Sequence, residues 1–170
     1  MKKLIIICTG LLMCLAASAQ NNIVTEFQKK FGKDVNFTNI SISKKMFEMT
    51  ATLMEDDMQE AEFFRDITGL KLIMTEKPDA KFMQEATRLI ERSGLEELMN
   101  VQDQADNVLM YVREKNGLIH ELVIAIQDTS EFMLMTITGK IDLKKISSLG
   151  KINGLEGVFS GNDQIEVNYR

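Results

Sequence analysis

Apolar residues recur every three or four positions in some parts of the chain, and at every second position or in short runs in others. The first pattern predicts amphipathic helices and the second predicts strands. The predicted helices are residues 22–33, 44–54 and 78–94, and the predicted strands are residues 36–43 and 67–75. Residues 55–62 are mostly acidic, so we expect a solvated loop or the end of a helix there.

The clearest strand pattern lies on both sides of Asn116-Gly117, where residues 108–112 and 119–126 form two hydrophobic runs. Asn-Gly between two such runs predicts a β-hairpin, because a type I′ turn needs positive φ at both central residues. A tight turn would pair Arg113 with His120, Tyr111 with Leu122, and Leu109 with Ile124.

After the hairpin, residues 128–130 turn the chain into a strand over residues 131–138, which completes an antiparallel three-strand meander at about 107–139. Before it, residues 95–103 are expected to form a turn of helix and then a short strand. Asp142 is placed to cap a last helix that runs to Leu149. Residues 150–170 form a tail that carries either one edge strand or no regular structure.

Helices and strands alternate in the first part of the chain, and strands follow one another later. This order predicts an α+β fold, a two-layer sandwich whose mixed sheet ends in the meander and whose helices pack on one face. We expect a single domain over residues 20–149. The length of 170 residues and the hydrophobic fraction of 45% suit one such domain.

Residues 1–19 differ from the rest of the chain. Lys2 and Lys3 give a basic start, residues 4–15 form an apolar run too short to span a bilayer, and small residues lead up to Ala19. These are the parts of a secretory signal peptide, so we expect cleavage after Ala19 and a periplasmic or envelope-associated protein. Lipidation of Cys14 is the competing interpretation, which the bulky residue before Cys14 disfavours.

Cleavage after Ala19 would remove both cysteines of the chain, Cys8 and Cys14. The mature chain would then form no disulfide, so its stability would come from packing. It would lose two of the 20 basic residues and none of the 25 acidic ones, which takes the formal charge from −5 to −7. This acidic chain has no lysine or arginine cluster, so we expect neither nucleic acid nor anionic lipid as a partner, and no transmembrane segment after cleavage.

Five segments carry a resemblance to a known family: Ile40–Met46, Val108–Val112, Lys115–Gly117, Glu121–Ile124 and Ile137–Leu143. Together they resemble the family catalogued as domain of unknown function 4252, over roughly residues 23–149. The resemblance implies a small exported or lipid-anchored envelope protein of Gram-negative gut-type bacteria, with no established activity and no functional residues to carry over. Many such proteins have a lipoprotein-type signal, from which Met13-Cys14 departs.

The residues that nucleophilic catalysis needs are mostly missing. Without a cysteine, hydrolysis would rely on Ser147 or Ser148 with the single His120, and no spacing brings these residues together. We expect His120 in a strand across from Arg113, where a neighbouring cation favours the neutral imidazole. The sequence therefore predicts a protein that is not an enzyme and has no catalytic residue and no cofactor. A pair of carboxylates acting as acid and base stays open, since any fold can bring two acids together.

Metal binding is also disfavoured by the residue inventory. Zinc sites need more cysteine or histidine, and residues 55–57 and 128–131 lack the ligand alternation and the glycine of a calcium loop. Thioethers bind Cu(I), and four methionines lie at helical intervals: Met46, Met49, Met54 and Met58. Because methionine also fills irregular gaps in cores, packing is the favoured interpretation and no metal site is predicted.

The predicted meander is apolar on both faces. One face would carry Leu109, Tyr111, Leu122, Ile124 and Ile126, and the other Val108, Met110, Val112, Ile119, Val123 and Ala125. An antiparallel sheet with one wet face would alternate apolar and polar residues, so either both faces are covered or one awaits a partner.

The leading hypothesis is therefore a non-catalytic exported binding domain. It would bind an unknown envelope protein, or a second copy of itself, through the second face of the meander. The alternative is a periplasmic carrier that encloses a small apolar ligand in a cavity lined by methionine and phenylalanine.

Overall fold

The structure, a computed structural model, describes residues 22–32, 36–54, 58–103 and 106–145. Its helices are α2 (Ile23–Phe31), α3 (Lys44–Leu53), α4 (Met58–Asp66) and α5 (Ala80–Arg92). Its strands are β1 (Thr38–Ser43), β2 (Ile67–Thr75), β3 (Glu96–Gln102), β4 (Asn107–Lys115), β5 (Leu118–Gln127) and β6 (Phe132–Ile141). The expected signal peptide with Cys8 and Cys14, and the expected tail at 150–170, lie outside the described residues.

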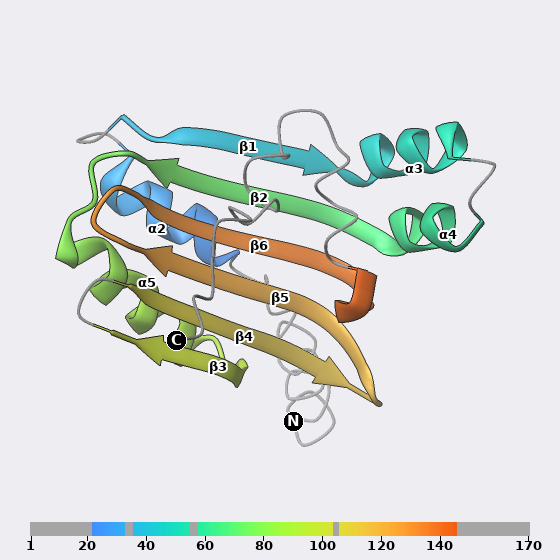
Figure 1. Cartoon of the computed structure of the whole chain (residues 1–170). Coiled ribbons are helices and arrows are strands. Elements are labelled where there is room, and N and C mark those ends of the chain that lie inside the picture. Colours follow the sequence, from blue (N-terminus) through green and yellow to red (C-terminus); the bar gives the residue numbers. More distant parts are fainter. Residues whose placement is uncertain (1–21, 33–35, 55–57, 104–105, 146–170) are drawn as a thin grey trace, which may run out of the picture.

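The six strands form one open sheet in the order β1-β2-β6-β5-β4-β3 (Figure 1). The α+β class and the meander β4-β5-β6 are confirmed. The expectation of a mixed sheet is wrong, because all five strand pairs are antiparallel. The reason lies in the connections: α3 and α4 return the chain beside β1, and the α5 crossover reaches the far edge of the sheet. The later meander then fills the space between β2 and β3.

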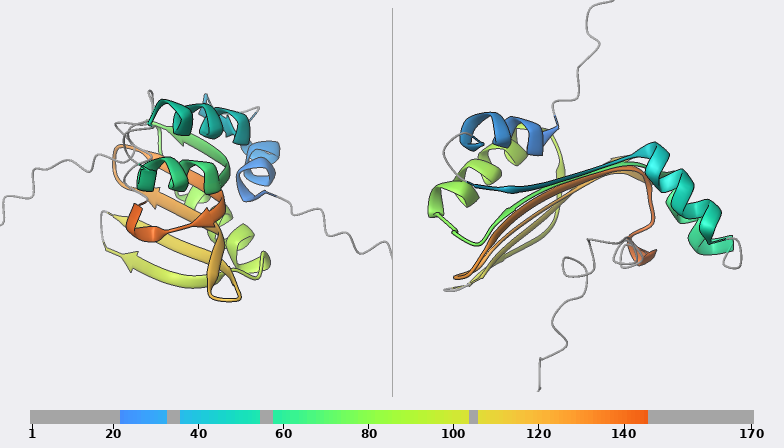
Figure 2. Two further views of the ribbon diagram at one scale, coloured as in Figure 1. Left: turned by 90° about the vertical axis from the view of Figure 1, so that its right-hand side faces the viewer. Right: turned by 90° about the horizontal axis from the view of Figure 1, so that it is seen from above.

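Helices α2 and α5 pack side by side on one face of the curved sheet, which we call the first face (Figure 2). Both begin as the sequence predicts, because the side chains of Asn22 and Asp79 accept hydrogen bonds from the backbone N–H groups of Thr25 and Lys81. The core beneath them is largely aromatic. The Phe27 ring stacks on Phe132 with centroids 5.2 Å apart.

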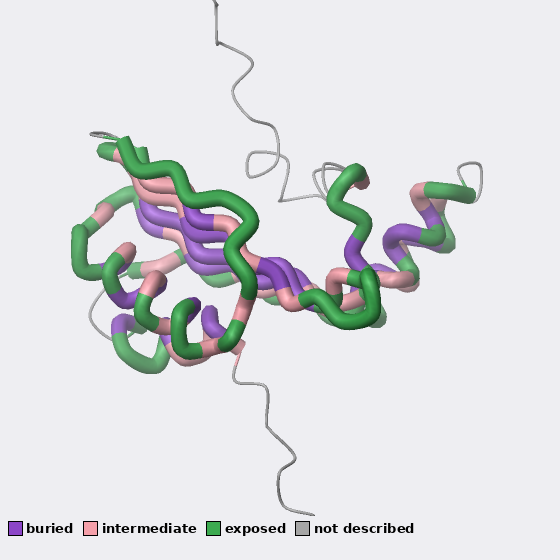
Figure 3. Tube along the Cα trace, turned by 90° about the horizontal axis from the view of Figure 1, so that it is seen from below, coloured by how far each residue is buried: buried purple, intermediate pink, exposed green. Residues whose placement is uncertain are grey.

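Helices α3 and α4 lie at one end of the sheet and contact its opposite face, which we call the second face (Figures 2 and 3). Helix α3 matches the prediction, whereas α4 occupies part of the stretch where we expected a loop or helix end. Of the acidic residues in α4 within this stretch, Glu62 is exposed and Glu60 is half-buried, while Ala61, Phe63 and Phe64 are buried. Burial of these three side chains stabilises a helix that the acidic run concealed.

The hairpin turn is confirmed, since Asn116 and Gly117 have φ values of 56° and 76°. The predicted pairing is wrong by one residue, because Arg113 pairs with Glu121 and not with His120. A β-bulge leaves His120 as an extra residue, and this reverses the two faces of β5 relative to β4. The first face therefore carries Leu109, Tyr111, Val123 and Ala125, and the second carries Val108, Met110, Val112, Leu122, Ile124 and Ile126.

Two smaller expectations are settled in part. The short strand in residues 95–103 is β3, but no turn of helix precedes it. Asp142 accepts a hydrogen bond from the backbone N–H of Lys144, and residues 143–145 form a single 3₁₀ turn. The rest of the helix expected up to Leu149 lies outside the described residues.

Candidate functional site

The second face is built from apolar side chains that line up across the strands. One row consists of Met74, Met133, Ile126, Val108 and Val101, and the next of Ile40, Leu72, Met135, Ile124, Met110 and Met99. A third row consists of Ile42, Leu70, Ile137, Leu122 and Val112. None of these side chains carries a charge, but Thr38 of β1 ends the first row and Glu96 of β3 ends the third. In the middle of the sheet Leu72, Met133 and Met135 are buried, so the exposed part of this face lies toward β3.

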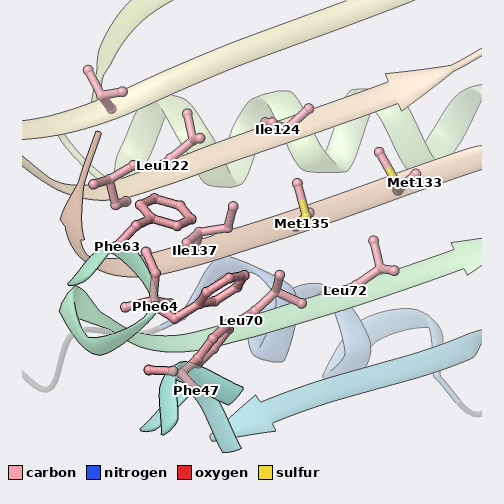
Figure 4. Close-up of a cluster of buried hydrophobic side chains, with 14 of the residues drawn as sticks. Phe47, Phe63, Phe64, Leu70, Leu72, Leu122, Ile124, Met133, Met135 and Ile137 are labelled. Atoms are coloured by element: carbon pink, nitrogen blue, oxygen red, sulfur yellow. The ribbon is translucent and has the colours of Figure 1, made fainter. Parts of the chain in front are cut away.

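Among the described helices, α3 and α4 are the ones that contact the second face. Figure 4 shows Phe47, Phe63 and Phe64 from these helices beside the third row. The first two rows continue away from the helices toward β3 at the sheet edge. There Met110 and Val108 are half-buried, and Met99 and Val101 are 39% and 45% exposed. The apolar surface therefore runs out to an open edge of the sheet.

Edge strand β3 is itself exposed at every position. It carries neither lysine nor proline, two residues that commonly protect sheet edges from pairing with other chains. Leu98 adds a third exposed apolar side chain to Met99 and Val101. One bulge, between Glu97 and Met99, interrupts its pairing with β4.

The first face changes character along its length. Under α2 and α5 it is apolar, with Ile73, Leu134, Ala125 and Leu109 in one cross-strand row. Beyond that row come a mixed row, Ser41, Lys71, Thr136, Val123 and Tyr111, and a polar row, Ser43, Gly69, Thr138, Glu121 and Arg113. The prediction from the sequence did not include this polar region.

Three groups of charged and polar side chains lie on the first face and in the helices that cover it. Glu85 of α5 is 5% exposed and accepts hydrogen bonds from Lys30 of α2, at 2.5 Å, and from Arg88. The hydrogen bonds from Arg88 are the main reason that the pKa of Glu85 is lowered to about 2. The Tyr111 hydroxyl donates to Glu97 at 2.6 Å, which raises the tyrosine pKa to about 12. Arg113 binds Glu121 and the carbonyl oxygen of Ser93 beyond the end of α5.

The candidate catalytic and metal residues are not brought together. His120 lies at the bulge, in a groove with Lys44, Arg65 and Lys140, and Ser147 and Ser148 lie outside the described residues. No group of three or more His, Cys, Asp or Glu within the described ranges could hold a metal ion.

The two acidic stretches and the four methionines have other roles where they are described. Asp128 accepts hydrogen bonds from Ser130 and from the backbone N–H of Glu131, so it closes a turn, and the Ser130 hydroxyl is the main group that lowers its pKa. Residues 55–57 lie outside the described ranges. Met54 packs against the core, whereas Met46, Met49 and Met58 are exposed. Among these four methionines, core packing, the favoured interpretation, therefore holds for Met54 alone.

A family model described as "Domain of unknown function (DUF4252)" matches residues 30–149. The comparisons with curated proteins and with solved structures found no match. No helix in the described part of the chain has both the length and the hydropathy to cross a membrane.

Proposed function

Because the chain belongs to the DUF4252 family, whose description assigns no activity, we propose a function from the chemistry of its surfaces. The protein is an exported, non-catalytic binding domain that associates with a second copy of itself through the second face. The observation that carries this proposal is the set of uncharged apolar rows that reach the open edge at β3.

A second copy suits this surface better than a polar partner does. Interfaces between identical subunits are more apolar than other interfaces, and most are related by a twofold axis that places the same patch on both sides.

The alternative function, a carrier of a small apolar ligand, needs an enclosed apolar cavity. A hollow of about 770 Å³ lies between β1, β2 and the start of α5, but its lining includes Glu76, Lys77 and Asp79. That lining suits water better than an apolar molecule. The carrier function is thus the less favoured proposal.

The association is tested by sedimentation velocity on the chain from residue 20, which retains every described element. We expect a monomer–dimer equilibrium at micromolar concentration. A double variant, Met99→Lys with Val101→Lys, should raise the dimer Kd at least about tenfold, since it places charges in the apolar rows. Asn100→Lys is the matched control, because Asn100 belongs to the same strand but faces the other way.

Two results would refute the association. One is a wild-type chain that stays monomeric up to about 100 μM, a concentration at which even weak dimers form. The other is a double variant that dimerises as well as Asn100→Lys. Native mass spectrometry of the same samples tests the carrier function, since a co-purified lipid or other apolar molecule would favour it.

Export is tested separately by producing the full chain in a Gram-negative host and sequencing the N-terminus of the periplasmic product. We expect the product to begin at Gln20. A product that begins at a lipid-modified Cys14 would support the lipid-anchored alternative, and a cytoplasmic product that retains Met1 would contradict export.

A further inference from the structure

A small pocket opens on the polar part of the first face, beyond the N-terminus of α2. It has a volume of about 270 Å³, and its lining includes Asn22, Ser41, Ser43, Lys71, Thr136 and Thr138. Its floor is the mixed row and the polar row of β1, β2 and β6, where hydroxyl groups and one ammonium group take the places that apolar side chains hold under the helices.

Lys71 lies in the floor of this pocket and has no counter-charge in the described part of the chain. Its ammonium donates a hydrogen bond to the Thr25 hydroxyl at 2.8 Å, and no described carboxylate lies within 4.0 Å of it. The side chain is half-buried, so water replaces a counter-charge less well than at an open surface. By contrast, Lys30 of the neighbouring α2 helix is paired with Glu85.

Thr136 supplies the second, independent observation. The residue is 1% exposed, and its hydroxyl oxygen has no hydrogen-bond partner among the described residues. Buried hydroxyls almost always have a partner, because leaving one unpaired costs about 1–3 kcal/mol. Thr136 is the cross-strand partner of Lys71, so a buried hydroxyl without a hydrogen-bond partner and a lysine without a counter-charge among the described residues lie on neighbouring strands.

The pocket adjoins a second hollow of about 480 Å³, with which it shares Thr68 and Thr138. This hollow contains the side chains of Lys44, Arg65, His120 and Lys140, together with Asp66 and Glu121. Both acids already have partners, since Asp66 lies 3.5 Å from Lys140 and Glu121 binds Arg113.

Arg65 and Lys44 therefore give the adjoining hollow a positive potential. Arg65 has no acidic partner within ion-pair distance among the described residues. Lys44 shares the exposed Glu48 with Lys45 at 3.7 and 3.8 Å. An anion that approaches the pocket through this hollow would be attracted along its path.

We propose that this pocket binds a small oxyanion, the carboxylate or phosphate group of a ligand whose remainder extends toward Arg65. Lys71 would supply the counter-charge, and the hydroxyls of Thr136 and Ser41 would donate hydrogen bonds to the anion. Gly69 leaves room above the sheet, since its position carries no side chain between Ser43 and Thr138. This site lies on the opposite face from the proposed dimer surface and does not depend on it.

The test uses the chain from residue 20 and two probes, inorganic phosphate and acetate, in NMR titrations that follow backbone amide shifts. We expect saturable shifts at residues 69–71 and 136–138, with a Kd below about 10 mM for at least one probe. Lys71→Gln should weaken that binding at least about tenfold, because it removes the counter-charge. Lys115→Gln, at the distant hairpin turn, is the matched control and should bind like the wild type.

Thr136→Val separates a binding role from a structural one. Because the hydroxyl has no hydrogen-bond partner among the described residues, its removal should not lower the melting temperature, whereas probe binding should weaken several-fold. The proposal is overturned if neither probe saturates, or if Lys71→Gln binds as tightly as Lys115→Gln. It is also overturned if Thr136→Val destabilises the fold and leaves binding unchanged.

Discussion

Substitution of Glu85 by glutamine should destabilise the protein at neutral pH and should do so progressively less in acid. Glu85 is buried between α2 and α5, where Lys30 and Arg88 hold its carboxylate. Glu85→Gln keeps the shape of the side chain but removes the charge on which both partners depend. The two helices would then share a weaker hydrogen bond, from a charged donor to a neutral amide oxygen.

The size of the effect follows from the pKa of Glu85, which falls from 4.5 to about 2. At 1.36 kcal/mol per pKa unit, that change corresponds to about 3 kcal/mol of stabilisation. The side chains of Lys30 and Arg88 are 53% and 48% exposed, so solvent screens part of the interaction. We therefore expect Glu85→Gln to cost about 1–2 kcal/mol at pH 7.

The pH dependence gives this prediction its sharpest test. A carboxyl group with a lowered pKa in the folded state stabilises fully above its unfolded pKa, near 4.5, and loses that stabilisation as the pH falls toward 2. The free energy of unfolding, measured in urea, should therefore differ between wild type and Glu85→Gln at pH 7, and the difference should shrink progressively as the pH falls from 4.5 toward 2. The control Glu48→Gln removes an exposed pair and should cost less than about 0.5 kcal/mol. A Glu85→Gln protein as stable as wild type at pH 7, or a deficit that stays constant down to pH 3, would refute the reasoning.

Three further predictions concern a glycine in β6, a phenylalanine of the core and a hydrogen bond between β3 and β4. Gly139 has a φ of 140°, and a Cβ there would lie 2.7 Å from Cα of Ile67. Gly139→Ala should therefore lower the free energy of unfolding by at least about 2 kcal/mol, a loss readable in urea melts. Phe27→Ala should cost about 3–5 kcal/mol by the same measurement, because the fully buried ring contacts four other phenylalanines. In an ultraviolet titration Tyr111 should keep its proton beyond pH 11, and Glu97→Gln should return its pKa toward 10.0; an unchanged pKa would exclude the hydrogen bond as the cause.

Elements whose burial follows a regular period could be predicted from the sequence. Strand β2 begins and ends where its pattern does, and α5 (Ala80–Arg92) lies within the predicted range of residues 78–94. The prediction failed where burial depends on distant partners. Helix α4 is such a case, because Phe63 and Phe64 are buried by the sheet and by α3, which no local pattern reveals.

The faces of the meander could not be predicted because one bulge decides them. Counting outward from Asn116-Gly117 gives the right turn but the wrong partner for Arg113, since the count assumes an unbroken ladder. His120 breaks the ladder beside the turn, and every residue of β5 beyond it then points to the other side. The prediction that both faces of the meander are apolar is nonetheless correct beyond the polar row of Glu121 and Arg113, because Val123 and Ala125 lie on one face and Leu122, Ile124 and Ile126 on the other.

The polar pocket could not be predicted from the sequence, for a different reason. Serine, lysine and threonine alternate with apolar residues in β1, β2 and β6, so the sequence does tell which side each polar residue takes. It does not tell that the three strands are neighbours, because β6 follows β2 by more than 50 residues and inserts beside it. Lys71 and Thr136 meet through that insertion alone.

The same alternation makes the two proposed surfaces separable by experiment. Successive residues of a strand point to opposite faces, so Lys71 and Thr136 lie between apolar neighbours that belong to the second face. A substitution at Lys71 changes the charge of one face and leaves the side chains of the other in place. Lys71→Gln should therefore leave the dimer Kd unchanged, and the Met99→Lys, Val101→Lys double variant should bind phosphate or acetate like the wild type. If either variant affected both properties, the sheet would not separate the surfaces, and one of the two binding proposals would have to be abandoned.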